Sequence, residues 1–346
     1  MNADTTAGKV KCLVWDLDNT LWNGTLLEEG EVTPREGVIQ VIHTLDERGI
    51  LQSIASRNDY NQAMAWLERF GLQEFFIYPQ INWERKSVSM QVIAEALNIG
   101  IDSLAFIDDQ PFERDEVAFV HPCVLCIDAA YLCHVPDMPV MMPRFLTEDS
   151  RRRRHMYQAD IKRKEVEECF DGAQDEFLAS LDMTITISPA EEEDLQRAEE
   201  LTLRTSQLNT TGYTYSYREL DKFRQSDCHH LWVTGLEDRY GTYGKIGLTL
   251  IETSEEEWWI RMLLMSCRVM NRGVGAVFIN HIRNRARDAG VRLLAEMIPN
   301  DRNRMMYMTY KFNHFRETGQ VGDLVIFEND LSQEQAFPDY LRLELR

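Results

Sequence analysis

Short apolar segments alternate with helical patterns between residues 9 and 133, and this alternation constrains the fold more than any other feature. Five segments have the length and composition of buried strands: residues 11–15, 51–55, 75–78, 104–107 and 124–127. Helical patterns at 36–48, 61–70 and 88–97 lie between them. The alternation predicts a parallel, doubly wound α/β sheet, and such sheets bind ligands at the carboxyl ends of their strands.

Polar side chains gather near those strand ends. Asp16 and Asp18 follow the first strand one residue apart, and Asp108 and Asp109 follow a later one. The other polar residues near strand ends and helix starts are Thr20, Ser56, Arg57, Asn58 and Lys86. A lone pair of acids after a strand is commonly a solvated strand end or a helix cap, but here four such points carry suitable groups. Phosphoryl transfer needs this combination of a nucleophile, a proton shuttle and Mg²⁺.

This pattern resembles the haloacid dehalogenase (HAD) superfamily. The resemblance implies that Asp16 is the nucleophile that becomes an aspartyl phosphate, and that Asp18 is the general acid and base. It implies Mg²⁺ as the cofactor, with Asp16, Asp18 (through its backbone carbonyl) and Asp108 as metal ligands. The expected phosphate-binding residues are Thr20, Ser56, Arg57, Asn58 and Lys86.

The segment between the first two predicted strands is short. It has room for a small flap at residues 22–32 and one helix, but not for a separate cap domain. A capless HAD-type Rossmann-like domain has an open mouth. Such a mouth favours a bulky substrate, or one delivered by another protein or domain.

Length and charge limit the remaining function classes. At 346 residues the chain exceeds the ~250–300 residues at which one core usually splits, so two domains are expected. The formal net charge of −20 argues against nucleic acid as a partner, because phosphate backbones require basic surfaces. No apolar run approaches the ~20 residues of a membrane span, and residues 1–6 lack signal-peptide features, so we expect a cytoplasmic protein with no membrane partner.

The seven cysteines are not expected to form disulfides in a reducing compartment. Cys123 and Cys126, with Cys133 and His134 downstream, have some of the spacing of a zinc site. However, residues 123–127 also form a compact apolar strand pattern, and no second paired motif exists. This favours small buried cysteines over zinc ligands.

The composition changes after residue 142. We expect a first domain at 1–147, a helical linker at 148–182, a second α/β domain at 183–330 and a C-terminal tail at 331–346. Four arginines at 151–154 open the linker, either as a solvated helix start or as a docking point for an acidic partner.

A predicted strand at 258–265 runs into a glycine-bearing turn at 266–275 and then a helix. Backbone N–H groups at such a helix start suit a phosphate group, and Arg268 and Arg272 add positive charge. The element order resembles the acetyltransferase-like (GNAT) fold. This implies that a loop of R-x-x-G-x-G/A type, here with Arg268, Arg272, Gly273 and Gly275, binds the pantetheine phosphate of an acyl carrier; Asn271 replaces the first glycine.

Cys267 lies immediately before this loop. A helix N-terminus and Arg268 should favour its thiolate, which could hold an acyl group and pass it to a second thiol. The alternative is a buried structural cysteine. The sequence does not identify the base that activates Cys267. Asn209, Asn303 and Tyr310 could line this site or serve packing. His281 and His314 are expected to be ordinary helix residues.

Together the two halves resemble the FkbH-like proteins of polyketide pathways, on residues 15–26, 106–114, 238–241 and 266–269. The resemblance implies capture of 1,3-bisphosphoglycerate, loading of its three-carbon acyl group on a cysteine as thioester, removal of phosphate, and transfer of glyceryl, or in some members lactyl, to an acyl carrier protein. The rival hypotheses are a small-molecule phosphatase whose second domain covers the site, a CoA-dependent acyltransferase, and a scaffold without chemistry. The complete set of acids speaks against a scaffold, since like charges held together cost stability.

Overall fold

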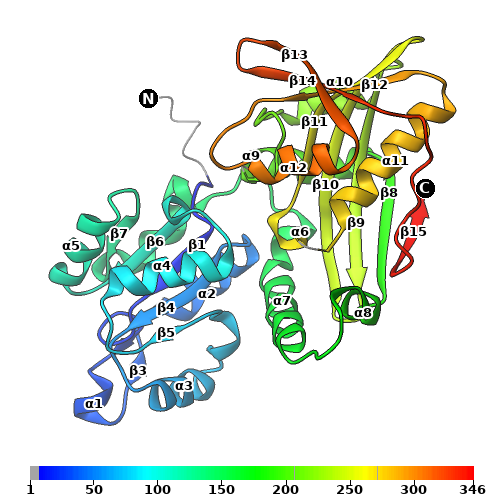
Figure 1. The fold of residues 1–346 in the computed structure, drawn as a ribbon. Helices are drawn as coiled ribbons and strands as arrows, with labels where there is room; N and C mark the ends of the chain where they lie inside the picture. The colour runs from blue at the N-terminus through cyan, green and yellow to red at the C-terminus, as the bar shows by residue number, and fades with distance from the viewer. Residues whose placement is uncertain (1–7, 206, 271) are drawn as a thin grey trace. The chain divides into compact units, whose positions relative to one another are not determined.

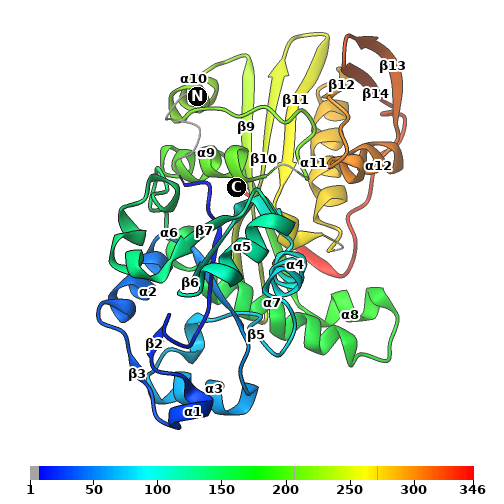
Figure 2. The same cartoon turned by 90° about the vertical axis from the view of Figure 1, so that its left-hand side faces the viewer.

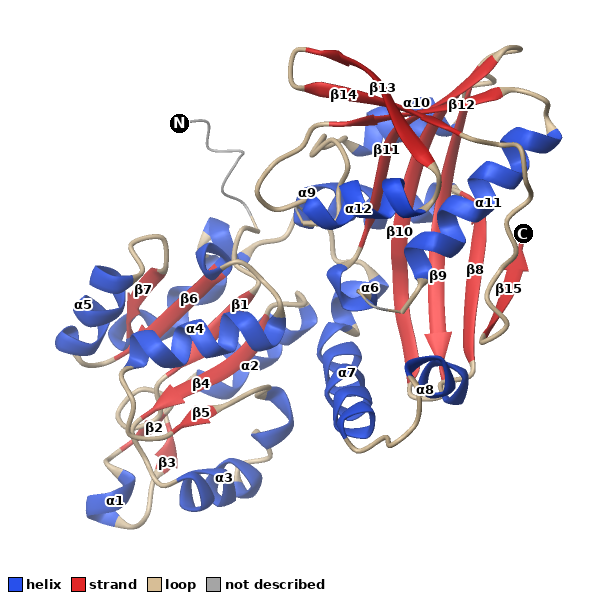
Figure 3. Ribbon diagram, in the orientation of Figure 1, coloured by secondary structure: helices blue, strands red, loops and turns tan. Residues whose placement is uncertain are grey.

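The structure, a computed structural model, describes residues 8–205, 207–270 and 272–346. The chain divides into two compact units, unit 1 at residues 1–159 and unit 2 at 160–346 (Figure 1). Each unit contains one large sheet with helices packed on it (Figure 3). In the described part of the chain, every helix is too short or too polar to cross a membrane.

Unit 1 has a five-stranded parallel sheet with strand order β5-β4-β1-β6-β7. Its strands are β1 (Cys12–Trp15), β4 (Leu51–Ser56), β5 (Gln80–Ile81), β6 (Leu104–Asp108) and β7 (Leu125–Asp128). Its helices are α2 (Val38–Glu47), α3 (Tyr60–Arg69), α4 (Lys86–Leu97) and α5 (Pro111–Val120), with 3-10 turns η2 (Gln73–Phe75), η3 (Ile101–Ser103), η4 (Ala129–Asp137) and η5 (Pro139–Met141). The central strand β1 is buried at all four positions, as its apolar sequence predicts.

The structure differs from the predicted sheet at residues 75–78. Residues 75–78, expected as a strand, lie around η2 and make a single bridge, between Phe76 and Gln52. Tyr78 has a φ of 51°, a left-handed conformation that interrupts extended backbone, and β5 begins just after it.

The flap expected between β1 and α2 is present. It consists of β2 (Trp22–Asn23) and β3 (Thr33–Pro34), an antiparallel pair, with the one-turn helix α1 (Leu26–Glu29) between them. Buried Trp22 and Leu26 join it to the core of unit 1. The flap is therefore a fixed part of unit 1 rather than a separate cap.

Unit 2 has an eight-stranded mixed sheet with order β13-β14-β12-β11-β10-β9-β8-β15 (Figure 1). Its strands are β8 (Met183–Pro189), β9 (His229–Asp238), β10 (Gly241–Thr253), β11 (Glu257–Met265), β12 (Arg292–Met297), β13 (Phe315–Val321), β14 (Leu324–Asn329) and β15 (Leu341–Leu345). Its helices include α9 (Leu195–Arg204), α10 (Tyr217–Arg224), α11 (Val274–Asp288) and α12 (Arg304–Phe312), with turns η6 (Glu192–Asp194) and η7 (Cys267–Val269). The pairs β11–β12 and β8–β15 are parallel and the other neighbours are antiparallel.

The two parallel strands in the middle of this sheet separate along their length. β12 pairs only with the first four residues of β11. Beyond that point residues 208–210 bridge the opening. The Thr210 N–H donates to the Leu263 carbonyl (3.0 Å), and the Ile298 N–H donates to the Thr210 carbonyl (3.0 Å).

The domain limits differ from those expected at 147, 182 and 330. Residues 148–182 form α6 (Glu148–Arg151), α7 (Arg153–Glu168) and α8 (Gln174–Ser180), and the division between the units falls within α7. Residues 331–346, expected as a tail, contain β15, which pairs with β8. The leucines of β15 explain this, because Leu341 and Leu343 pack against the core of unit 2.

The arginine run at 151–154 is half buried in unit 1 rather than solvated. Arg153 donates to the Gly49 carbonyl (2.9 Å). Arg154 pairs with Asp46 and Glu74, each at 3.0 Å, and is 8% exposed. The charge of Arg154 is already matched inside this unit, and Arg153 is buried, so the run does not offer four free cations to an acidic partner.

Candidate active sites

The acids of unit 1 converge because their strands are parallel neighbours. Asp16 follows β1 directly, Asp108 ends β6, and β1 pairs with β6. The Asp16 N–H donates to the Ile107 carbonyl (3.0 Å), which fixes the backbone at this edge. Asp16, Asp108 and Asp109 each offer a carboxylate oxygen within 4.8 Å of the others. The sequence-predicted convergence of Asp16 and Asp108 is thus present in the structure.

Lys86, the first residue of α4, lies in the middle of this cluster. Its Nζ donates to Asp16, to Asp108 Oδ2 (3.2 Å) and to the Ala55 carbonyl (2.7 Å), and the residue is 3% exposed. Burial opposes its charge, but the attraction of Asp16 and Asp108 outweighs burial and raises the pKa of Lys86. Lys86 is therefore a buried ammonium group fixed beside the predicted nucleophile.

One ammonium group does not balance three acids. Burial, and then the neighbouring Asp16 charge, raise the pKa of Asp108 to about 7. The same two causes raise the pKa of Asp109. Clustered carboxylate oxygens are the ligands that Mg²⁺ prefers, and a divalent cation would supply the missing charge. The donor set thus fits Mg²⁺, held by Asp16, Asp108 and Asp109.

Asp18, the predicted acid and base, is held by the flap. One carboxylate oxygen accepts from Trp22 Nε1 (2.8 Å) and from the Leu26 N–H (3.1 Å), and the other accepts from Asn58 Nδ2 (3.0 Å). Burial raises the pKa of Asp18 even though these hydrogen bonds oppose the rise. A half-buried carboxyl with a raised pKa can carry a proton for a leaving oxygen.

The predicted phosphate-binding residues take different positions. Ser56 ends β4 and is buried, next to the carbonyl that accepts from Lys86. Asn58, expected on phosphate, instead donates to Asp18. Arg57 points to Glu113, with 2.9 Å between Nη1 and Oε1, so this acid already occupies its guanidinium.

Thr20 also has a partner that the sequence did not reveal. The Asp109 N–H donates to Thr20 Oγ1 (2.9 Å), and this hydroxyl lies 3.4 Å from Asp109 Oδ1. Thr20 is fully buried, so it orients Asp109. The tandem acids at 108–109 were the available signal, but only the structure adds Asp109 to the carboxylate cluster that could hold a metal ion.

The second candidate site lies where β11 ends. Ser266 and the turn η7 follow the strand, and Cys267 opens this turn in a half-buried position. Gly273 caps α11 with a φ of 74°, a conformation that favours glycine, and a Cβ there would meet the Tyr340 hydroxyl. A Cβ on Gly275 would meet Met265 Cε at 2.7 Å. Asn271, the departure from the GNAT-like loop pattern, lies outside the described residues.

The two arginines of this loop each keep an unused donor. Arg268 Nη2 donates to the Tyr243 carbonyl (2.7 Å), and Arg272 Nη2 pairs with Glu167 (3.0 Å). In both residues the buried Nη1 has no hydrogen-bond partner among the described residues. Buried donors without partners are costly, and an anionic group bound at this loop would satisfy them.

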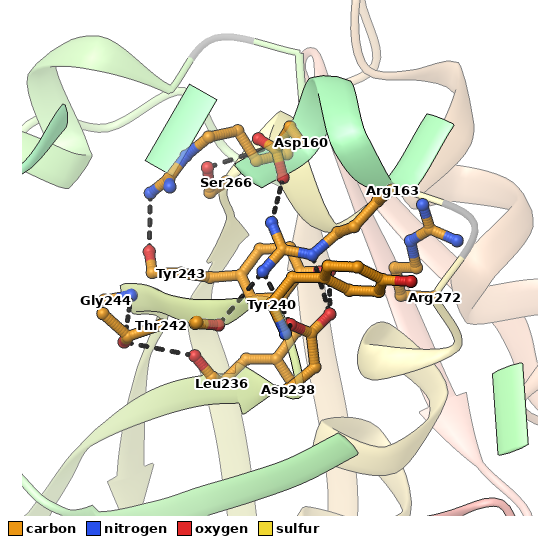
Figure 4. Close-up of polar contacts among 12 residues, drawn as sticks. Asp160, Arg163, Leu236, Asp238, Tyr240, Thr242, Tyr243, Gly244, Ser266 and Arg272 are labelled. Carbon is orange, nitrogen blue, oxygen red and sulfur yellow. Dashed lines mark hydrogen bonds and ion pairs between the residues drawn. The ribbon is translucent and has the colours of Figure 1, made fainter. Parts of the chain in front are cut away.

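Beneath the loop lies a buried charge network that sequence reasoning missed (Figure 4). Arg163, 1% exposed, holds both oxygens of Asp238 at 2.7 Å and donates to Asp160 at 2.7 Å. Its guanidinium carbon lies 3.9 Å from the centre of the Tyr243 ring, whose hydroxyl donates to Asp238 (3.1 Å). Because the Tyr243 carbonyl accepts from Arg268, the network positions one of the loop arginines.

The open candidates for a second-site base have mainly structural contacts. Asn303 Nδ2 donates to the carbonyls of Asn209 (3.1 Å) and Ile298 (2.9 Å), so it fastens the bridging segment. Burial lowers the pKa of His281 to about 4, and its ring packs against Trp232 at 5.0 Å. His281 is thus a neutral core residue of α11.

No model of a protein family matches the sequence, and no curated protein matches it. Among solved structures, the chain is similar to the N-terminal part of the protein BF1531 from Bacteroides fragilis, which contains a phosphatase domain complexed with Mg. The two share 28% identity over 36% of this chain and 40% of that chain, with a TM-score of 0.33. The present chain therefore spans well under half of that structure.

The chain is also similar to acetyltransferases. It shares 16% identity with the ribosomal-protein-S18-alanine N-acetyltransferase from Escherichia coli, over 43% of this chain and 95% of that chain, with a TM-score of 0.35. It shares 13% identity with a GNAT family acetyltransferase from Elizabethkingia anophelis with acetyl-CoA bound, over 42% of this chain and 97% of that chain, with a TM-score of 0.30. The strand orders described above confirm the predicted fold class, a Rossmann-like parallel sheet followed by a GNAT-like mixed α/β unit.

Proposed function

We propose that this chain captures 1,3-bisphosphoglycerate, holds its acyl group as a thioester on Cys267, removes the remaining phosphate at Asp16, and passes the three-carbon glyceryl unit to the phosphopantetheine thiol of an acyl carrier protein. The observation that carries the proposal is the cluster of Asp16, Asp108 and Asp109 around buried Lys86, in one chain with a cysteine-bearing loop that keeps unused arginine donors.

Loading would take place in unit 2. The Cys267 thiolate attacks the carbonyl carbon of the acyl phosphate, the carbon–oxygen bond to phosphate breaks, and phosphate leaves. An acyl phosphate is already activated, so this step needs no nucleotide. Arg268 and Arg272 support it, because each adds positive charge to this loop, and the Nη1 atom of each has no hydrogen-bond partner among the described residues.

Dephosphorylation would take place in unit 1. The Asp16 carboxylate attacks phosphorus, the bond from phosphorus to the glyceryl oxygen breaks, and Asp18 gives its proton to that oxygen. Water then attacks the aspartyl phosphate and gives a proton to Asp18. Lys86, fixed beside Asp16, offsets the charge that develops on the phosphoryl oxygens. Mg²⁺ would supply further charge neutralisation from the three-carboxylate site.

Release would use the carrier's thiol. That thiol attacks the thioester carbon, the bond to Cys267 sulfur breaks, and the acyl group leaves on the carrier. Thioester exchange is nearly balanced in energy, so it requires proximity rather than a further energy source.

Intact-protein mass spectrometry after incubation with Mg²⁺ and 1,3-bisphosphoglycerate tests the proposal. A glyceryl-sized adduct that disappears in Cys267→Ala, and a phosphoglyceryl-sized adduct that accumulates in Asp16→Asn, are the expected results. Cys228→Ala, which removes an exposed cysteine of unit 2, is the control and should load normally. Loading of Cys267→Ala at the rate of the native protein would remove Cys267 from the mechanism.

A phosphatase without acyl transfer is the second candidate. The completeness of the unit 1 site favours it, because Asp16, Asp18 and Lys86 are all in place without any contribution from Cys267. It predicts phosphate release from small phosphorylated metabolites at equal rates in native protein and Cys267→Ala.

A further inference from the structure

The outer face of α12 carries apolar side chains that the described part of the chain leaves partly exposed. Met305, Met308 and Phe312 are 47%, 36% and 75% exposed. They recur with spacings of three and four residues, so they form one stripe along the helix. The opposite face is buried through Met306 and Tyr310, which is enough to anchor the helix. The stripe is therefore not needed to hold α12 in place.

The charge around this stripe is opposite in sign to that of the whole chain. The chain carries a formal charge of −20, yet residues 302–312 contain three basic side chains and no acidic one. Arg302 and Arg304 are exposed, and among the described residues neither forms an ion pair. Lys311 has one acidic neighbour, Glu317, at 3.8 Å. A cationic, apolar strip on an acidic protein fits a partner that is acidic and apolar.

The stripe also adjoins the cysteine-bearing loop. Thr309 lies on the same face of α12 as the apolar residues, and its Cγ2 is 3.6 Å from the place of a Cβ on Gly275. Gly275 belongs to the first turn of α11, directly after the loop with Arg268 and Arg272. α12 and α11 lie side by side in both views (Figures 1 and 2). A domain bound to α12 would hold a flexible arm at the mouth of that loop.

We propose that α12 is the docking surface for an acidic helix of a phosphopantetheine-carrying domain. In this arrangement Met305, Met308 and Phe312 bind the apolar side of that helix, and Arg302, Arg304 and Lys311 bind its carboxylates. The inference rests on the proposed function for the identity of the arm, but not for the charge and apolar character of the surface. The arginine run at 151–154 suits this role less well, because Arg154 is already paired with Asp46 and Glu74 within unit 1.

Two variants test the surface, Met308→Glu and the double variant Arg302→Glu/Arg304→Glu. Phe119→Glu, at an exposed position of unit 1, and Arg218→Glu, at an exposed position on α10 of unit 2, are the matched controls. The first readout is binding of a fluorescein-labelled holo acyl carrier protein of a bacterial fatty-acid synthase, measured by anisotropy. We expect Kd to rise about tenfold or more in both α12 variants and to stay unchanged in the controls. The double variant should also lose most of the salt dependence.

The second readout is acyl transfer from the loaded enzyme, to the carrier protein and to free pantetheine. In the α12 variants the KM for the carrier protein should rise while kcat stays unchanged. Transfer to free pantetheine should stay at the native rate. Equal carrier binding by Met308→Glu and native protein would overturn the proposal. Equal slowing with pantetheine would also overturn it, because α12 would then act on the loop itself.

The outcomes separate this inference from the proposed function. If native protein never forms an acyl adduct, the proposed function fails, and the binding readout alone decides the docking surface. If Met308→Glu abolishes self-association in sedimentation and leaves carrier binding intact, a second copy of the chain occupies the stripe, and the carrier is excluded there.

Discussion

Replacing Asp238 by Ala should destabilise unit 2 far more than the loss of an ordinary ion pair. The Asp238 and Arg163 side chains are 0% and 1% exposed, and two hydrogen bonds of 2.7 Å join them. In Asp238→Ala the buried Arg163 would lose its two-point partner and keep Asp160 as its acidic neighbour. Removing one partner of a buried pair costs about 3–5 kcal/mol. For a unit of the size of residues 160–346, this corresponds to a fall in Tm of roughly 6–20 °C.

Differential scanning calorimetry measures this change, and two further variants sharpen it. Arg163→Met/Asp238→Leu removes both charges, so it should regain at least half of the lost stability. Arg292→Met removes an exposed arginine that also has two acidic partners, Glu257 and Glu328, and should lower Tm far less than Asp238→Ala does. A fall below about 2 °C in Asp238→Ala, or a double variant as unstable as the sum of the two single ones, would refute the reasoning.

Three further predictions concern the sites and the core. Gly273→Ala should slow acyl loading about tenfold, because a Cβ at this position would meet the Tyr340 hydroxyl beside the loop. Gly322 also has a positive φ but has open space around it, so Gly322→Ala should load normally. Mass spectrometry of the acyl adduct compares the two variants. Mg²⁺ at about 100 times its Kd should raise the free energy of unfolding of unit 1 by about 2.7 kcal/mol in calorimetry, and a chelator should reverse this. The pKa of His281 is about 4 in the folded protein and about 6.5 when unfolded. Between these pH values the unfolded chain binds more protons than the folded protein. The free energy of unfolding therefore falls as the pH drops from 6.5 to 4, by about 3 kcal/mol. His281→Asn should remove this part of the acid sensitivity, and equal pH profiles of Tm would contradict it.

The parallel sheet of unit 1 could be predicted because its strands are short, apolar and buried on both faces. β1 is the clearest example, with four buried residues in a row. The error at residues 75–78 has a physical reason. Phe75, Phe76 and Ile77 are apolar because they pack in the interior, and burial alone does not distinguish a strand from a turn.

The acids of the candidate site could also be predicted, since parallel strands bring their carboxyl ends to one edge. The directions of Arg57 and Asn58 could not, because each depends on a partner from a distant segment, Glu113 and Asp18. The pair of Arg163 and Asp238 joins residues 75 positions apart. Nothing in the local pattern of either residue indicates that it is buried.

The pairing of β15 with β8 has a consequence for the synthesis of the protein. The register joins Met183 to Leu341, so these neighbours emerge from the ribosome far apart in time. Until β15 is made, β8 is an unprotected sheet edge that can pair with another chain. Unit 1 ends at residue 159, so its whole sequence is made long before β15 and it can fold meanwhile. Slow translation or loss of the last strand should therefore produce aggregates that contain a native first unit and a misassembled second one.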